Sequence, residues 1–342
     1  MPLPTDIARY GHRYQVILRN DETAIEVVAD RVQSVDPRFT ANLEKAYELG
    51  NVDPVGTATD PTEYTVVIED NLHNSETDLV LAGQDPTSGS SFCVADFVTN
   101  DDLHVYIVIR DNSDNLTEEL AYTDGVLAEI TWRFVVGGAC TTSVTINCAH
   151  GCMYSSGSTV TSGSGLIHTT WGAGDLVSPG IIKGKDARIC LGGTVEAANR
   201  TYRLQSFSVR AAFPVQAVKE LGTRSLVGQL IGPPDVTVDF DLLMADHQPI
   251  EILTNLSSGS TCLSFDDLAE FNAAIRLYDP DQAQTAGNVL KAWVLENMRV
   301  STGTPVRAQV RGLATMRYTC TVGRATTPAC GGLKVYTTGD IP

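Results

Sequence analysis

The residues with the spacing of a metal site are Cys148, His150 and Cys152, in the segment Cys-Ala-His-Gly-Cys. In an extended strand alternate side chains point to one face, so these three would face the same way. Together with Cys140 they would supply the thiolate and imidazole ligands of a tetrahedral zinc site. The spacing is not that of a standard zinc knuckle, and partly buried residues beside a flexible segment have the same pattern. We therefore expect no metal and no other cofactor, and keep these four residues as the metal candidate.

Carboxylates are the other residues whose pattern could do chemistry. Asp239 and Asp241 fall on one face of a strand, as paired catalytic carboxylates can, and as an ordinary exposed strand face does. The segment 111–115, Asp-Asn-Ser-Asp-Asn, resembles the start of a calcium loop, but Leu116 stands where the loop needs glycine, so we expect a solvated turn. The chain has no GxxxxGK[ST], GxGxxG or HExxH motif. We expect that the protein is not an enzyme; a hydrolase using the two aspartates or the cysteine segment is the alternative.

The charge of the chain is unevenly distributed. The net charge of −17 argues against a protein that grips nucleic-acid phosphates. All of the acidic excess falls in residues 1–172, and the rest of the chain is balanced. The acidic half is either a solubilising face or a wall that repels a polyanion and lets it slide.

Cysteines and the N-terminus bear on where the protein works. The N-terminus lacks the basic start and apolar run of a signal peptide, and no stretch has the length of a transmembrane helix. We therefore expect a protein made in the cytosol, without a disulfide framework, whose eight cysteines are mostly small buried side chains.

An internal repeat organises the sequence. Residues 31–68 and 203–240 align without a gap at an offset of 172 (203 − 31), with 12 identities in 38 positions, where chance gives roughly two. The signature that we single out is Arg31, Gln33, Ser34, Glu48, Leu49 and Gly50 in the first segment and Arg203, Gln205, Ser206, Glu220, Leu221 and Gly222 in the second. These residue types fit a strand edge, a helix end and a turn, which would maintain the fold. Alternatively, the shared arginine and glutamate make equivalent salt bridges between neighbouring modules, the arrangement that a ring needs.

Each copy is predicted to contain a strand that leads into a short helix and then further strands. Thr40 would cap the first helix and Gly50 would end it, whereas Pro214 would begin the second and Gly222 would end it. The predicted fold is mainly β, with two tandem copies of a β-sandwich or barrel, each with one short flanking α-helix. The boundaries are 1–155 for the acidic first copy, 156–180 for a Gly/Ser/Thr-rich linker or hairpin, and 181–342 for the second copy.

The repeated pattern of a Gln-Ser strand, a Glu-Leu-Gly helix end, a Val-Gly loop and a Pro-x-x-x-Thr-Val strand resembles the major tail tube proteins of long-tailed bacteriophages. The resemblance implies a β-sandwich that forms hexameric rings, which stack into a tube that conducts DNA to the host. Duplicated members form pseudo-hexameric rings of three chains. Because the acidic excess is confined to one copy, the lumen of such a ring would not be uniformly charged.

This resemblance also implies partners and a location. The chain would self-associate in the virion tail after assembly in the host cytoplasm, with tail terminator, tail-tip and tape-measure proteins as partners. DNA would pass through without specific binding, and no membrane would be involved. Segments 83–100 and 151–180 are the candidates for contacts between rings. The alternative is a two-domain β-sandwich binding module or a tail-tip or hub component, in which Trp132, Trp171 and Trp293 would be stacking platforms rather than core.

Overall fold

The structure is a computed structural model, and strands make up most of it. It describes residues 14–21, 23, 25–29, 31–41, 43–46, 56–59, 62–72, 76–86, 91–100, 102–110, 116–155, 181–191, 204–220, 226–243, 269–307, 315–323, 330 and 332–337. The prediction of a mainly β fold is confirmed, with large antiparallel sheets and one α-helix among these residues. None of the helices found there has the length and apolar character needed to span a membrane.

The described residues of the first segment (residues 1–155) form ten strands and one α-helix. They are β1 (Tyr14–Asn20), β2 (Ile25–Ala29), β3 (Val32–Thr40), β4 (Leu43–Ala46), β5 (Gly56–Thr59), β6 (Glu63–Asn71), α1 (Glu76–Leu81), β7 (Ser91–Cys93), β8 (Leu103–Arg110), β9 (Leu116–Val135) and β10 (Thr141–Ser155). A 3₁₀ turn, η2 (Val94–Val98), follows β7.

The second segment (residues 181–342) contributes nine described strands. They are β11 (Ala187–Leu191), β12 (Leu204–Ala212), β13 (Val215–Val218), β14 (Gly228–Ile231), β15 (Asp235–Leu243), β16 (Phe271–Tyr278), β17 (Val289–Arg307), β18 (Thr315–Val322) and β19 (Leu333–Thr337). The linker or hairpin predicted over 156–180 lies outside the described residues.

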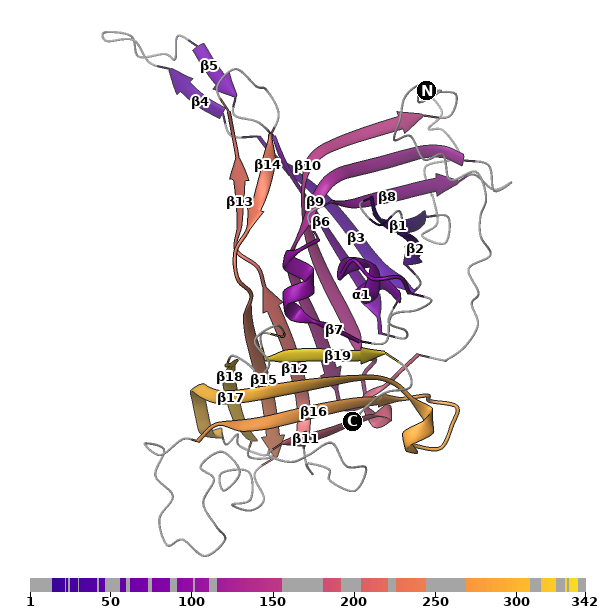
Figure 1. Cartoon of the computed structure of the whole chain (residues 1–342), viewed down its shortest axis with the longest axis vertical. Coiled ribbons are helices and arrows are strands. Elements are labelled where there is room, and N and C mark those ends of the chain that lie inside the picture. Colours follow the sequence, from indigo (N-terminus) through magenta and orange to yellow (C-terminus); the bar gives the residue numbers. More distant parts are fainter. Residues whose placement is uncertain are drawn as a thin grey trace, which may run out of the picture.

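One 15-stranded sheet runs through both segments (Figure 1). In the first segment its order is β1-β8-β9-β10-β6-β3, and in the second it is β11-β16-β17-β18-β15-β12. Read in this order, the strands of the two series correspond one to one: β1 to β11, β8 to β16, β9 to β17, β10 to β18, β6 to β15 and β3 to β12. They join where β12 pairs with β9.

Strand bounds follow the offset of the sequence repeat. β3, β4, β5 and β6 have the same lengths as β12, β13, β14 and β15, and both bounds of each pair are 172 residues apart (204 − 32 for β3 and β12). The pairings agree as well, including a register shift between Val32 and Ser34 that recurs between Leu204 and Ser206.

The two predicted short helices are strands instead, which corrects that part of the sequence analysis. β4 pairs with β5, and β13 pairs with β14, so each segment carries a two-stranded hairpin (Figure 1). A helix this short gains little from its own hydrogen bonds, whereas the hairpin forms a ladder with a strand farther along the chain. Val215 and Val218 also favour strand through their branched side chains. Gly50 and Gly222, the predicted helix ends, lie outside the described residues.

One large hydrophobic cluster connects the two segments. Trp132 on β9 and Trp293 on β17 are both fully buried, and their rings meet edge to face with centroids 5.9 Å apart. These two tryptophans are therefore core residues and not exposed stacking platforms, whereas Trp171 lies outside the described residues.

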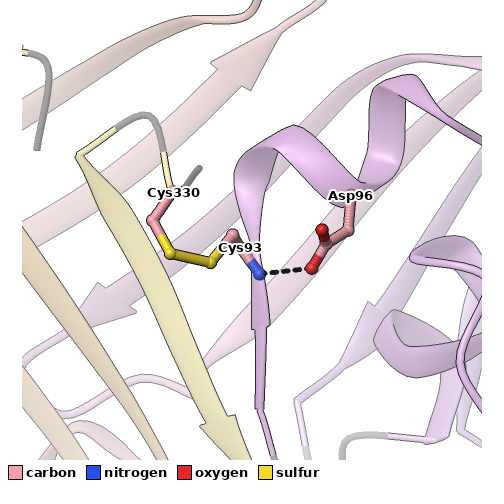
Figure 2. Close-up of a disulfide and its surroundings, with 3 residues drawn as sticks. All are labelled: Cys93, Asp96 and Cys330. Carbon is pink, nitrogen blue, oxygen red and sulfur yellow. Dashed lines mark hydrogen bonds between the residues drawn. A yellow bond between two sulfur atoms is a disulfide. The ribbon is translucent and has the colours of Figure 1, made fainter. Parts of the chain in front are cut away.

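A disulfide also links the segments, contrary to the expectation of reduced cysteines. Cys93, at the end of β7, is bonded to Cys330, just before β19, and β7 pairs with β19 beside it (Figure 2). Asp96 of η2 accepts a hydrogen bond from the Cys93 N–H at 2.7 Å. The pairing depends on strands 237 positions apart, which no local spacing reveals. Four other cysteines are buried free thiols, as expected: Cys140, Cys148, Cys190 and Cys320.

Candidate assembly interface

The junction between the two segments is a β-ladder. β12 pairs with β9 from Ser206 opposite Val135 to Ala212 opposite Glu129. The apolar side chains that β12 directs into the core are completely covered here: Phe207, Val209 and Ala211 are at most 1% exposed. At this internal junction a strand of the second segment thus pairs with β9 of the first segment, and its inward-facing side chains are covered.

An ion pair crosses the internal junction. Arg210 on β12 donates a hydrogen bond to Glu129 on β9 at 2.6 Å, and Thr131 donates a second one to the same carboxylate at 3.3 Å. The hydrogen bond from Arg210 lowers the pKa of Glu129 below its usual value, although partial burial opposes that shift. Both partners are substantially exposed, so the pair contributes less than about 1 kcal/mol.

A hairpin from the second segment also holds the first. We call β13–β14 the inner arm and its counterpart β4–β5 the outer arm; both project toward the same end of the molecule (Figure 1). Gln229 on β14 donates hydrogen bonds to the backbone oxygens of Asn147 at 3.1 Å and Asp124 at 3.4 Å. Lys219, just after β13, lies 3.5 Å from the Glu63 carboxylate on β6. The inner arm therefore adds polar contacts to the ladder of the internal junction.

β3, which corresponds to β12, forms an open edge. Among the described residues its only strand partner is β6, whereas β12 has β15 on one side and β9 on the other. The counterpart of the fully buried Ala211 is Phe39, whose side chain is 72% exposed. Pro37 removes one N–H donor from this edge, but the other residues of β3 keep theirs. β3 therefore exposes an apolar side chain, Phe39, at the position where the internal junction buries Ala211.

The second open edge is on β17, which corresponds to β9. Residues 289–298 of β17 pair with β16 on one side, and residues 298–307 pair with β18 on the other. Beyond Met298, the β16 side of β17 has no strand partner in the described part of the chain. The corresponding part of β9, which lies beyond the residues paired with β8, pairs with β12. Within the described residues, the sheet thus has two open edges, β3 in the first segment and the part of β17 beyond Met298 in the second.

The repeat signature is only partly within the described residues. Ser34 donates a hydrogen bond to Glu69 at 3.1 Å, and Ser206 donates one to Asp241 at 2.7 Å, both across 35 positions. The two serines thus link the same pair of strands in each segment. Gln33 bonds the Arg31 backbone oxygen at 3.0 Å, Gln205 bonds that of Leu204 at 3.4 Å, and Glu220 is exposed after β13. The members outside the described residues are Glu48, Leu49, Gly50, Arg203, Leu221 and Gly222.

The ion pair at the internal junction was not found by sequence reasoning. Arg210 is identical to Arg38 at the repeat offset, so the repeat could have indicated it. Its partner Glu129 lies where the two copies no longer align without gaps. In the open β3 edge, Arg38 bonds instead to Asp36 on its own strand at 2.8 Å.

The four metal candidates do not converge. Cys148, His150 and Cys152 lie on β10, whereas Cys140 stands just before that strand, eight positions from Cys148, and an extended chain covers roughly 26 Å over this distance. Burial raises the pKa of Cys140 to about 12 and also raises the pKa of Cys148, which disfavours the thiolate that zinc requires. His150 instead lies 3.2 Å from the Asp124 carboxylate. This arrangement does not fit a four-ligand zinc site.

The remaining chemical candidates are engaged in the sheet. Asp239 accepts a hydrogen bond from Thr319, and Asp241 accepts one from Ser206, so both carboxylates connect neighbouring strands. The calcium-loop segment 111–115 lies outside the described residues. Of the predicted inter-ring segments, the part of 83–100 around Phe92 and Phe97 is buried in the core, with those two rings 5.3 Å apart.

One cluster that the sequence did not connect is formed by Asp21, Asp102 and His104, whose ligand atoms lie within 4.8 Å of one another. Arg19 bonds Asp21 at 2.6 Å, and His104 contacts Asp102 at 3.0 Å and the Tyr106 hydroxyl at 3.0 Å. Each carboxylate already faces a basic side chain. The cluster is therefore a network of polar contacts that ties the turn after β1 to β8.

Comparison with known proteins gave partial structural similarities. No protein-family model matches the sequence, and no curated protein is similar to it. The chain is similar in part to a chain in the cryo-EM structure of the anti-feeding prophage baseplate, with 12% identity and a TM-score of 0.33 over 45% of this chain and 98% of that one. It is also similar in part to the cap that terminates the tube of the anti-feeding prophage, with 13% identity and a TM-score of 0.35 over 49% and 98%. We therefore take the function from the chain's own strand edges.

Proposed function

We propose that the chain is a structural protein that assembles head to tail, β3 of one chain pairing with the open edge of β17 on the next. The observation that carries this proposal is the internal junction, where β12 fills the position on β9 that stays open on β17. A head-to-tail contact repeated around an axis closes into a ring or continues as a filament. Closure pairs both edges and so removes the aggregation risk of open strands.

The finer proposal is that three chains form a pseudo-hexameric ring and that rings stack into a bacteriophage tail tube that conducts DNA. The matching strand bounds support a duplication, and two equivalent modules per chain supply six positions from three chains. The outer arm would contact the next chain in the way that the inner arm contacts β9 and β10. Because the acidic excess lies in the first segment, acidic and neutral modules would alternate around the lumen, which would weaken adhesion of DNA. The function is conduit and assembly, without catalysis.

Phe39 provides the test. Its 72% exposed side chain can change without disturbing the core, but the internal junction buries the equivalent position completely. We expect Phe39→Glu to remain folded by circular dichroism and to stay monomeric in analytical ultracentrifugation, because pairing would bury a charge. Phe39→Leu, the matched control, should form rings and tubes in negative-stain electron microscopy as the wild type does. A wild type that stays monomeric throughout a concentration series would refute the proposal and favour a two-domain binding module.

Register gives a second test. Thr40 corresponds to Ala212, which lies opposite Glu129 across the internal junction. The paired residues that lead from β6 through β10 to Glu129 on β9 have counterparts that lead from β15 through β18 to Thr302 on β17. Thr302 is therefore the position expected to lie opposite Thr40 of the next chain. Thr40→Cys with Thr302→Cys in one chain should therefore give covalent oligomers up to the trimer on a non-reducing gel, and Thr40→Cys alone should not. Equal crosslinking by the single variant would show that β3 meets another strand.

A further inference from the structure

A lysine is completely buried where the two segments meet. Lys291, on β17, is 1% exposed, and its Nζ lies 4.9 Å from the ring centre of Trp293 and 5.9 Å from that of Trp132. Its hydrogen-bond partner is the Asp78 carboxylate on α1, which is 3% exposed. Trp132 donates its Nε1–H to the same oxygen of Asp78 at 3.3 Å. The amine and the carboxyl group are thus held together in an aromatic environment away from water.

A second buried carboxyl group interacts with this lysine. Asp70, on β6, is 6% exposed, and its Oδ1 has no hydrogen-bond partner among the described residues. Burial raises the pKa of Asp70 to about 6, against the opposing effect of the Lys291 charge. Burial likewise lowers the pKa of Lys291 to about 7, although the charge of Asp70 opposes the shift. Because burial lowers the pKa of Lys291 and raises that of Asp70, the neutral amine and the protonated carboxyl group both become accessible near neutral pH.

We propose that Lys291 and Asp78 form an intramolecular isopeptide bond that joins the two segments covalently. The amine loses one proton, which passes by way of Asp70 to the Asp78 carboxylate, so a neutral amine faces a neutral carboxyl group. The lone pair of Nζ attacks Cγ of Asp78 to form the new N–C bond, and the π electron pair of the C=O bond moves onto its oxygen. The tetrahedral carbon then re-forms the C=O bond and expels the hydroxyl oxygen with the electron pair of its C–O bond; that oxygen takes a second proton from Nζ and leaves as water. An ammonium and a carboxylate thus become an amide and one water molecule, and no oxidant or activating cofactor is needed.

The site favours this product over a permanent ion pair. A buried ion pair retains the desolvation cost of both charges, whereas the amide that replaces it is neutral. Trp132 can donate its hydrogen bond to the amide oxygen as it does to the carboxylate. The proximity imposed by the fold replaces a bimolecular encounter and supplies a large effective concentration. The bond would connect positions 213 apart in the sequence, next to the region that the disulfide also links.

Intact mass spectrometry of the full-length protein, reduced to open the disulfide, tests the proposal directly. The wild type should be lighter than its sequence mass by one water, and tandem spectra of a protease digest should show one branched peptide joining the segments around 78 and 291. A wild type with the full sequence mass, or a water loss that maps elsewhere, overturns the inference.

Variants separate the bond from the fold. Lys291→Met and Asp78→Leu should both have the unmodified mass expected for their sequences, with no branched peptide. Asp70→Asn keeps both bonding partners, and we expect it to fold and to lose at least 90% of the branched peptide, because it cannot accept the lysine proton. The branched peptide at wild-type yield in Asp70→Asn overturns the proton-transfer role of Asp70. Branched peptide in the monomeric Phe39→Glu variant is expected, since the bond forms within one chain and does not depend on assembly.

Discussion

Replacing Trp293 by alanine tests whether the two segments unfold as one unit. Trp293 is fully buried in the second segment, and its ring contacts two rings of the first: Trp132 at 5.9 Å and Phe134 at 5.2 Å between centroids. One cluster of buried side chains, with members from both segments, surrounds it. Removing this ring should therefore destabilise the whole sheet and not the second segment alone.

The expected loss for Trp293→Ala is about 3–5 kcal/mol in the free energy of unfolding, the usual cost of removing a buried tryptophan ring. Trp293→Phe is the matched control. It leaves a smaller cavity, and it also removes the indole N–H, which has no hydrogen-bond partner among the described residues. An unsatisfied buried donor costs about 1–3 kcal/mol, so relief of that cost offsets much of the lost packing. We expect Trp293→Phe to be nearly neutral.

The assay is equilibrium unfolding in guanidinium chloride, followed by far-ultraviolet circular dichroism and by tryptophan emission. In the wild type and both variants the two probes should report one coincident transition, displaced to lower denaturant for Trp293→Ala only. Two separate transitions, with only one of them moved by Trp293→Ala, would refute the shared core. A loss below about 1 kcal/mol in the alanine variant would refute the packing argument for this position.

Three further predictions follow from single contacts. A Cβ at Gly184 would lie 2.2 Å from the backbone oxygen of Val135, so Gly184→Ala should lower the unfolding free energy by about 1–3 kcal/mol in urea titrations. Glu129→Gln removes the pair with Arg210 and should cost less than about 1 kcal/mol at neutral pH. Because the folded-state pKa of Glu129 is lowered, its contribution exists above the unfolded pKa and should vanish as pH falls through the folded pKa, so wild type and variant converge in acid. Cys93→Ser should lower the melting temperature under oxidising conditions and leave it equal to that of the reduced wild type, with calorimetry as the measurement.

Local patterns predicted the fold class well and the hairpins poorly. Alternating apolar residues, β-branched side chains and frequent turns indicate a β protein, and the repeat offset of 172 recurs in the strand bounds (204 − 32). The segment around Val215–Val218 has apolar residues three apart, which a helix turn and a short strand both accommodate. Its partner β14 begins ten positions after β13 ends, and pairing with it decided the outcome.

The candidate interface shows the same division. The sequence indicated Ser34 and Ser206 as equivalent positions, and they make equivalent hydrogen bonds to β6 and β15. It did not indicate which strand edges stay open, because an edge is defined by the absence of a partner that any distant strand could have supplied.

The sequence by itself therefore determined the strand content, the repeat and the uneven charge, all of which are properties of neighbouring residues or of composition. Only the tertiary structure brought Lys291 to Asp78 and left Phe39 exposed where Ala211 is covered. The physical reason is that burial and strand pairing are contacts between segments far apart in the chain. Their free energy depends on which surfaces meet, and no local pattern of residue types contains that information.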